Sequence, residues 1–524
     1  MLDRRDFLRR ALQFSAAGLL VPTFLRGENL LWPSVARGAG GRLSVDSPFA
    51  GKILVWINLN GGNDGLNAAV PYTSAAYYGL RPNLAIPPGQ VSPLSGTLGL
   101  HPSLSGLASL YGAGQLAVIQ GVGYPNMNLS HFRGTDIWFS GSDEDVILET
   151  GWLARFIESV YTDFPYLVPD SPYGVQQGAH RLPLTGARGL TGVVVDDPSS
   201  FLYIVSEGYT GEWVDPLPAT HGGDELAYVR RLDADTFAYA GAIQEASDAG
   251  SNTVAYPQTS LGSQLSIIAR LISGGLATPC FLASEYGFDT HAYQADPHAS
   301  LLSSVGGSTA AFWQDLANLG LQDRVLVMTT SEFGRRPEEN GSIGTDHGTS
   351  APHFVLGTRV NGGIYGVNPN VQDLDGAGNL LVQHDFRSVY STVLRNHFGQ
   401  GSSLVDGVLL GSFGDLGFLD TVTDVPPPAT QPQFGDRLHL PQPNPVSLRS
   451  GGAVQLRFEL RASAPVTLDL FDLQGRRIAR LAQGTHSAGP HELTWAPRGL
   501  AAGSYLARLT TPSARRTAKI IVLP

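Results

Sequence analysis

Short apolar runs alternate with longer amphipathic stretches through most of the chain. Six of the runs predict buried strands, at residues 53–59, 116–121, 192–195, 279–283, 324–330 and 353–357. The longer stretches predict helices at residues 225–246, 262–273, 298–319 and 386–398. Buried strands that alternate with helices are typical of an α/β fold, with a mostly parallel central sheet and helices on both faces. We expect this fold for residues 41–423.

The pattern changes beyond residue 423. Residues 424–443 are rich in proline, which predicts an extended and semi-rigid linker. In the segment that follows, apolar and polar side chains alternate over short stretches, at residues 456–460, 466–470, 476–481, 492–495, 504–509 and 519–523. Strands this short at this spacing predict a small all-β sandwich over residues 444–524.

Residues 1–40 have the features of an export signal. Basic side chains precede an uncharged apolar stretch at residues 11–25, which is shorter than the roughly 20 residues that span a bilayer. The segment Arg4-Arg5-Asp6-Phe7-Leu8 is similar to the twin-arginine motif. We therefore expect the twin-arginine export machinery to read residues 1–40 and deliver the protein to the periplasm. An ordinary secretory signal or an uncleaved anchor is the alternative.

Charge and cysteine content exclude several classes of function. The net charge is −11, and residues 41–436 carry 38 acidic against 16 basic side chains. A body this acidic argues against nucleic-acid binding and is compatible with binding a cation. The single cysteine, Cys280, excludes an intramolecular disulfide and a thiolate-rich zinc site. Because Cys280 lies in an apolar run, we expect it to be buried and inert.

Carboxylates and imidazoles follow several of the predicted strands. The carboxyl ends of parallel strands lie at one edge of a sheet, so we expect these side chains to converge there. Such groups bind divalent cations, here Zn²⁺, Mn²⁺ or Ca²⁺. The candidate ligands are Asp64, Asp289, His291, Glu332, Asp346 and His347. Taken singly, each also fits a turn, a cap or an ion pair. The glycines that flank Asp346 and His347 suit a close approach of the backbone to another segment.

Ser130 is the candidate nucleophile. It precedes a predicted helix start, where free backbone N–H groups favour an anion such as a phosphoryl or sulfuryl group. A nearby metal ion would lower the pKa of the serine hydroxyl. Arg133 and Arg335 are candidates for binding the oxygens of a small anionic ester substrate. The alternative is that Ser130 only caps the helix.

Several of these motifs resemble the exported "domain of unknown function 1501" family, over residues 1–415. They lie at residues 59–67, 128–138, 151–153, 287–291, 331–335 and 344–348. That family is usually placed in the alkaline phosphatase and sulfatase superfamily. The resemblance implies metal positions at the carboxyl edge of the sheet, with Ser130 as the nucleophile and the candidate acids and histidines as ligands. Phe333 stands where the superfamily has a histidine ligand.

The C-terminal segment resembles another group, the sorting tails of type IX secretion. The similar motifs are Asn444-Pro445 and residues 470–475, 500–505 and 519–522. This resemblance implies recognition by an outer-membrane secretion machinery and a final location at the cell surface or outside the cell. We therefore expect an exported metal-dependent hydrolase of phosphate or sulfate esters. The alternative, motivated by Phe333 and the tail, is a secreted or cell-surface binding protein that keeps the fold without catalysis.

Overall fold

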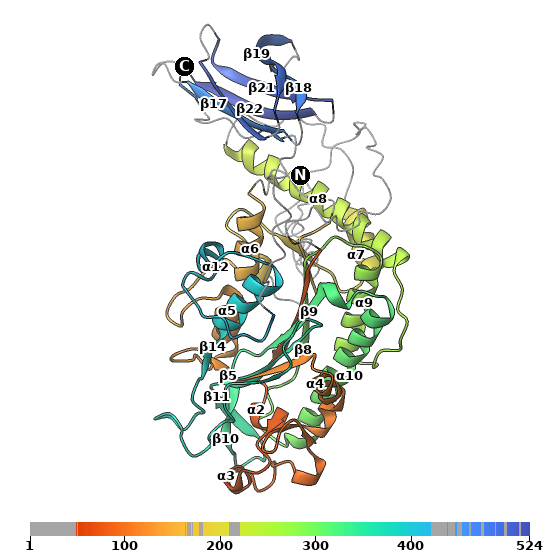
Figure 1. Ribbon diagram of the computed structural model, residues 1–524, viewed down its shortest axis with the longest axis vertical. Helices are drawn as coiled ribbons and strands as arrows, with labels where there is room; N and C mark the ends of the chain where they lie inside the picture. Colours follow the sequence, from red (N-terminus) through yellow and green to blue (C-terminus); the bar gives the residue numbers. More distant parts are fainter. Residues whose placement is uncertain are drawn as a thin grey trace, which may run out of the picture. The chain divides into compact units, whose positions relative to one another are not determined.

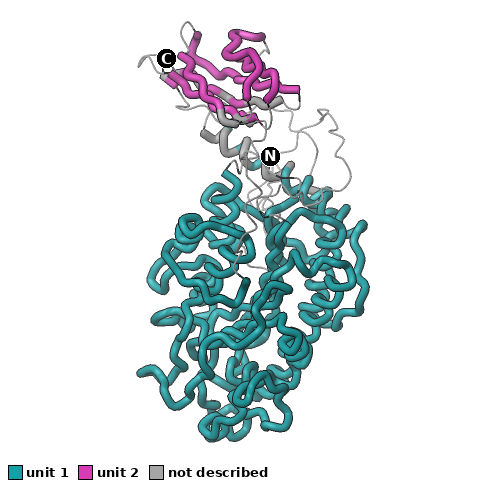
Figure 2. The backbone as a smooth tube through the Cα atoms, viewed as in Figure 1, with its two compact units in different colours: residues 1–423 teal, residues 424–524 magenta. Residues whose placement is uncertain are grey.

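The computed structural model divides into two compact units, Met1–Thr423 and Asp424–Pro524 (Figure 2). In the first unit, the structure describes residues 49, 51–162, 164, 169, 171–177, 182–208 and 221–420. In the second, it describes residues 437–438, 446–447, 453–460, 463–472, 476–487, 489–496, 500–512 and 515–523. The predicted signal peptide and most of the predicted linker lie outside these residues.

A nine-stranded sheet forms the centre of the first unit. Its strands, in spatial order, are β13 (Gly363–Tyr365), β5 (Leu116–Gly123), β12 (Ala351–Leu356), β9 (Val325–Thr330), β1 (Ile53–Asn60), β8 (Cys280–Tyr286), β6 (Gly174–Gln176) and β7 (Gly192–Val194), and β14 (His384–Asp385) also pairs with β5. Strand β12 runs antiparallel to both of its neighbours, and the other pairs are parallel. All six predicted strands belong to this sheet, so the predicted fold class is confirmed.

Helices cover both faces of the sheet (Figure 1). One face packs against α4 (Ser105–Gly112), α8 (His221–Ala249), α9 (Ser260–Ser273) and α10 (Ala295–Asn318). The other packs against α5 (His131–Ser140), α6 (Trp152–Val160), α11 (Phe386–Thr392) and α12 (Ser402–Leu409). Successive residues of a strand point to opposite faces, so Val55 of β1 lies in the first core and Trp56 in the second. The helix predicted at 386–398 is α11 followed by a π-helical turn, Val393–His397.

Smaller elements surround the sheet. They are α2 (Gly65–Ala68), β2 (Ala69–Val70), α3 (Ala75–Leu80), β3 (Ser92–Pro93), β4 (Gly99–Leu100), α7 (Pro198–Gly208), β10 (Gly334–Glu339) and β11 (Thr345–Gly348). Strands β10 and β11 form an antiparallel hairpin in which Arg335 faces His347. Asp346 and His347 therefore lie on a strand.

The second unit is a β-sandwich. One sheet contains β15 (Arg437–Leu438), β17 (Val454–Leu460) and β20 (Gly489–Trp495). The other contains β16 (Val446–Ser447), β22 (Arg515–Leu523), β21 (Gly503–Thr510), β18 (Ala464–Asp472) and β19 (Arg477–His486). Both sheets contribute to one core, for example Phe458 of β17 and Leu468 of β18. The predicted all-β sandwich is confirmed.

Two further expectations concern the core and the membrane. Cys280 is fully buried in β8, and burial raises the pKa of its thiol, as expected for an inert side chain. None of the helices in the described part of the chain combines the length and apolar composition needed to cross a bilayer.

Candidate metal centre

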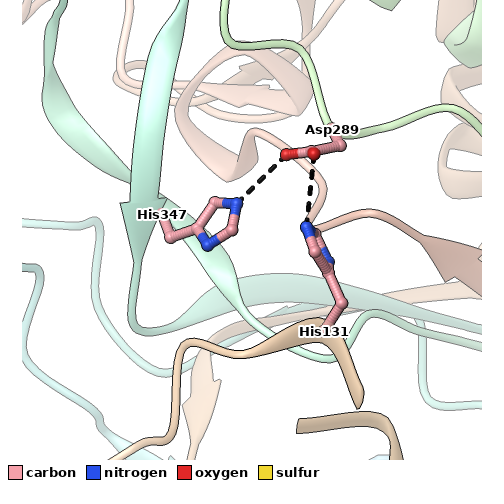
Figure 3. A group of neighbouring side chains, drawn as sticks. All are labelled: His131, Asp289 and His347. Carbon is pink, nitrogen blue, oxygen red and sulfur yellow. Dashed lines mark hydrogen bonds and ion pairs between the residues drawn. The ribbon is translucent and has the colours of Figure 1, made fainter.

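Three segments that are distant in sequence bring potential metal ligands together at the edge of the sheet (Figure 3). His131 is the first residue of α5, Asp289 follows β8, and His347 lies on β11. Each offers one ligand atom, and these atoms lie within 4.8 Å of one another. One carboxylate and two imidazoles therefore face a shared space.

The separations of the two histidines from Asp289 are close to those between ligands of a tetrahedral ion. The Nε2 atom of His131 lies 3.3 Å from Oδ2 of Asp289, and Nε2 of His347 lies 3.1 Å from Oδ1. Ligand atoms around a tetrahedral zinc ion with bonds of about 2.0–2.1 Å are separated by about 3.3 Å. Nδ1 of His131 is 2.8 Å from the carboxylate of Glu332, so the neutral ring carries its proton on Nδ1 and its lone pair on Nε2, the nitrogen that faces Asp289.

His291 lies beside this group. Its Nε2 is 3.1 Å from Oδ1 of Asp289 and 3.0 Å from Nε2 of His347. On the other side of the ring, Nδ1 is 3.3 Å from Asp346, which also accepts a hydrogen bond from Asn340. That bond from Asn340 lowers the pKa of Asp346. Asp346 therefore contacts His291 on the side that faces away from Asp289, which suits a role in orienting the ring.

Glu332 lies behind His131. Its side chain is 1% exposed, and Oε1 is 2.8 Å from Nδ1 of His131 while it accepts the backbone N–H of Gly61 at 2.7 Å. The hydrogen bond with Glu332 raises the pKa of His131 against the opposing effect of burial. A carboxylate that binds the far nitrogen of a ligating histidine fixes its tautomer and ring orientation. Oε1 of Glu332 thus supports His131, whereas Oε2 is buried without a hydrogen-bond partner among the described residues.

Arg335 supports Asp289 in a similar way. Its side chain is fully buried, and Nη2 donates to Oδ1 of Asp289 at 2.7 Å. Nη2 also contacts the carbonyls of Gly61 and Phe288, while Nε and Nη1 donate to the carbonyls of Gly62 and Thr345. Burial would raise the pKa of Asp289, but the hydrogen bonds from Arg335 and His347 hold it well below its usual range. Asp289 is therefore an anion, and Arg335 is not presented to a substrate.

The second candidate for substrate binding, Arg133, is also occupied. Its Nη2 donates to the carbonyls of Asp143, Glu144 and Val146, at 3.1, 3.0 and 2.7 Å. These bonds fasten α5 to the loop that follows it. Arg133 and Arg335 therefore both bind groups of the protein near the cluster. The expected role was contact with an anionic ester.

Asp64 lies outside the cluster. Its side chain is fully buried, and Oδ2 is 2.6 Å from Nη1 of Arg81, which is also fully buried. Gln294 donates a second hydrogen bond to the same oxygen. Burial opposes ionisation, but the charge of Arg81 lowers the pKa of Asp64. Arg81 and Gln294 thus occupy Oδ2 of this carboxylate, whereas Oδ1 is buried without a hydrogen-bond partner among the described residues.

The Asp64 pair nevertheless connects to the cluster through Gln294. The side-chain oxygen of Gln294 accepts hydrogen bonds from Thr290, between Asp289 and His291, and from Thr345. We call Asp64, Arg81, Gln294 and the nearby pair Asn63–His298 the sealed network. His298 contacts Asn63 at 3.0 Å and is buried, as is Asn63. Through Gln294, the sealed network supports the backbone segments that carry the candidate ligands.

Glycine at two positions of the hairpin allows the ligand segments to approach. A side chain at Gly344 would come within 2.2 Å of the backbone at His291, and one at Gly348 within 2.5 Å of the backbone at Arg335. The expected close approach at these glycines is therefore present, and it brings His347 to Asp289.

Ser130 occupies the N-cap position of α5, and its side chain makes no capping hydrogen bond. The residue is exposed, and its backbone N–H donates to Asn128 at 3.0 Å. Its hydroxyl is therefore not committed to the helix. The next residue, His131, is a potential ligand that the sequence analysis missed. The available clue was an imidazole adjacent to the candidate nucleophile at a helix start.

Comparison with known proteins gives a partial family match. Residues 228–395 match the model of a family described as "Protein of unknown function (DUF1501)". This range includes Asp289, Glu332 and His347 but neither Asp64 nor His131. No curated protein is similar enough to this chain to count as a match.

Among solved structures, similar folds include a sulfatase, PsFucS1 from Pseudoalteromonas sp., at 11% identity with a TM-score of 0.32, covering 85% of this chain and 83% of that one. A protein in the alkaline phosphatase superfamily from Vibrio parahaemolyticus has 10% identity and a TM-score of 0.32, covering 87% and 79%. PorZ, a surface component of the type IX secretion system of Porphyromonas gingivalis, has 20% identity and a TM-score of 0.13. That match covers 17% of this chain and only 12% of PorZ.

Proposed function

We propose that the first unit is a metal-dependent hydrolase of phosphate or sulfate esters. The observation that carries this proposal is the convergence of His131, Asp289 and His347, whose ligand atoms lie within 4.8 Å of one another at the edge of the sheet. A divalent cation in such a site supplies positive charge and lowers the pKa of a water or hydroxyl that it binds.

The donor set favours zinc over calcium. Two imidazoles and one carboxylate are ligand types found in catalytic zinc sites, which keep one position open. Calcium prefers six to eight oxygen ligands, and only Asp289 supplies oxygen within the three-residue group. His291 is available as a further nitrogen ligand, since its Nε2 is 3.1 Å from Asp289.

Residues of the chain prepare the site for an anionic substrate. Glu332 and Arg335 hold His131 and Asp289 in place, so the ligands do not have to reorganise when a cation binds. Ser130, the proposed nucleophile, is exposed and adjacent to His131, at the N-terminus of a ten-residue helix. Free N–H groups of the first turn there favour a negatively charged oxygen.

The test combines metal analysis with activity. Untagged protein is analysed for bound metal, and hydrolysis of 4-nitrophenyl phosphate and 4-nitrophenyl sulfate is measured with added Zn²⁺ or Mn²⁺. The variant H131A should lose at least 100-fold in zinc affinity and in hydrolysis, because it removes a direct ligand. The control is H491A, which changes a partly exposed histidine of the second unit and should leave both unchanged. Apoprotein that stays inactive in either metal would contradict the enzyme proposal.

A second candidate function is a binding protein that has kept the fold and the metal site without catalysis. The favouring observation is that the two candidate arginines and Asp64 are committed to buried or backbone contacts. Among the described residues in contact with Asp289, no further lysine or arginine is free to take their place. Zinc binding without turnover, together with an S130A variant that keeps the biological effect, would support this function.

We also propose export and surface delivery, which rest on the sequence motifs at residues 1–40 and 444–524. Replacing Arg4 and Arg5 by lysine should retain the precursor in the cytoplasm, because the twin-arginine machinery reads that pair. A chain that ends at residue 443 should reach the periplasm and stay there. Normal surface delivery of the shortened chain would contradict the role of the tail.

A further inference from the structure

The chain that leads from β9 into β10 carries a buried aromatic ring between two supports of the candidate metal centre. Oε1 of Glu332 contacts His131, and Nη2 of Arg335 donates to Asp289. Phe333 lies between these two residues in the sequence and is 1% exposed. A phenylalanine side chain offers neither charge nor ligand atom, so it can act on the centre only by packing.

The ring of Phe333 contacts both imidazoles of the centre. Its centroid lies 4.9 Å from that of His131 and 4.5 Å from that of His347, with interplanar angles of 38° and 37°. The two imidazoles are themselves 4.6 Å apart, centroid to centroid. Aromatic rings that pack directly on one another have centroids about 4.5–7 Å apart. The three rings therefore form one packed group, and two of them carry the ligand nitrogens.

The backbone at Gly62 also lies against the ring of Phe333. A side chain at Gly62 would overlap Cδ2 and Cε2 of that ring. Gly62 has φ of 76°, a left-handed conformation that favours glycine, and its carbonyl accepts a hydrogen bond from Nε of Arg335 at 2.7 Å. The ring is therefore packed against a fixed segment of backbone as well as against the two imidazoles, which limits its movement.

Each imidazole has one hydrogen bond at Nδ1. Nδ1 of His131 is 2.8 Å from Glu332, and Nδ1 of His347 is 2.8 Å from the backbone carbonyl of Leu129. A hydrogen bond at one atom holds that atom but leaves the ring free to tilt about it. A tilt displaces Nε2, the nitrogen that each ring offers to the cation. Packing of Phe333 against both rings restricts that tilt.

We propose that Phe333 is a positioning residue that fixes the tilt of both imidazoles and keeps water out of the side of the centre that it occupies. The inference rests on the proposed metal centre and concerns a side chain that does not itself bind the cation. A cation held there can recruit few further ligands, which suits tetrahedral zinc. Manganese prefers an octahedral set of oxygen ligands, so it should bind less well. Phe333 thereby contributes to the choice of metal ion.

The test uses the full-length protein and two readouts that do not depend on turnover. Affinities for Zn²⁺ and Mn²⁺ are measured by competition with a metal-binding dye. The visible absorption of bound Co²⁺ reports its ligand number, because tetrahedral Co²⁺ absorbs more strongly than octahedral Co²⁺. The variant F333L removes the ring and keeps an apolar side chain. The matched control is F354L, which changes a buried phenylalanine of β12 in the core on the first face of the sheet.

We expect the ratio of zinc to manganese affinity to fall about tenfold or more in F333L, as is typical for loss of a group that orients a ligand. The absorption per bound Co²⁺ should weaken as water enters, and F354L should show neither change. Unchanged ratio and absorption in F333L would overturn the role of Phe333 while leaving the metal centre intact. An equal change in F354L would show a general effect of the core and would also overturn it.

Wild-type protein that binds neither Zn²⁺ nor Co²⁺ would overturn the metal centre, and the role of Phe333 with it. If F333L does not fold, F333M takes its place, because methionine fills more of the space of the ring without its flat shape. The same two readouts then decide the question.

Discussion

Asp64 and Asp289 follow neighbouring parallel strands, β1 and β8, yet their surroundings differ. The side chain of Asp64 is fully buried and paired with one arginine, whereas that of Asp289 is 46% exposed and surrounded by Arg335, His131, His291 and His347. Two carboxylates at the same edge of one sheet thus serve different purposes. Asp64 is buried beside a countercharge, which favours a structural role. Asp289 is exposed and lies beside histidines that can also bind a metal ion, which makes it a candidate ligand.

The largest effect should come from breaking the sealed network. R81M leaves the charge of Asp64 buried and unpaired, which should lower the free energy of unfolding by about 3–5 kcal/mol. The double variant D64L/R81M, which removes both charges, should recover most of that loss. Urea denaturation measures both. A loss from R81M below about 1 kcal/mol, as for an exposed ion pair, would remove the distinction between the two carboxylates.

A smaller effect is expected from the support of the metal ligand. E332Q keeps the shape of the side chain but replaces the carboxylate that binds Nδ1 of His131. Zinc affinity should fall ten- to 100-fold, about 1.4–2.7 kcal/mol, as is typical for loss of such a partner. Competition with a zinc-binding dye gives the affinity. Unchanged affinity would mean that Glu332 does not position His131.

The pH dependence of stability should expose the sealed network as well. Burial lowers the pKa of His298 from 6.5 to about 4, so the unfolded chain binds more protons between those values. The free energy of unfolding should therefore fall as the pH drops from 6.5 to 4. By pH 4.5, the free energy of unfolding should have fallen about 2 kcal/mol less in H298Q than in the wild type. The control H491Q, at a partly exposed histidine of the second unit, should show the wild-type slope. A wild-type slope in H298Q would contradict the assignment.

The smallest effect should come from Asp346. Its side chain is 56% exposed and contacts His291, which is outside the three-residue group. D346N should change zinc affinity less than about threefold, because an exposed charge contributes little. A loss approaching that of H131A would show that Asp346 is itself a ligand.

The sequence predicted the sheet well because its strands are continuous apolar runs, such as that of β9, which burial on both faces requires. It also predicted that Asp289 and His347 would meet, since both lie near the carboxyl edge of the sheet. The ion pair of Asp64, in contrast, could not be predicted from the pattern of apolar and polar residues. Asp64 pairs with Arg81, which directly follows α3, and the local sequence around neither residue indicates that contact.

The same limitation explains His131 and Arg335. His131 reaches Asp289 only because α5 begins beside β9 and the hairpin, an arrangement fixed by packing of the whole domain. Arg335 was a candidate for binding the substrate because its local sequence does not indicate that the side chain is buried. In the structure its guanidinium lies among five acceptors of the surrounding loops.

The most direct test of the account is a crystal structure of zinc-loaded protein, with anomalous scattering recorded at the zinc absorption edge. The account predicts a single strong peak bonded at about 2.0–2.2 Å to Nε2 of His131, Nε2 of His347 and a carboxylate oxygen of Asp289. It predicts no peak at Asp64. A peak between Asp64 and Arg81, or no peak at the three ligands, would contradict it.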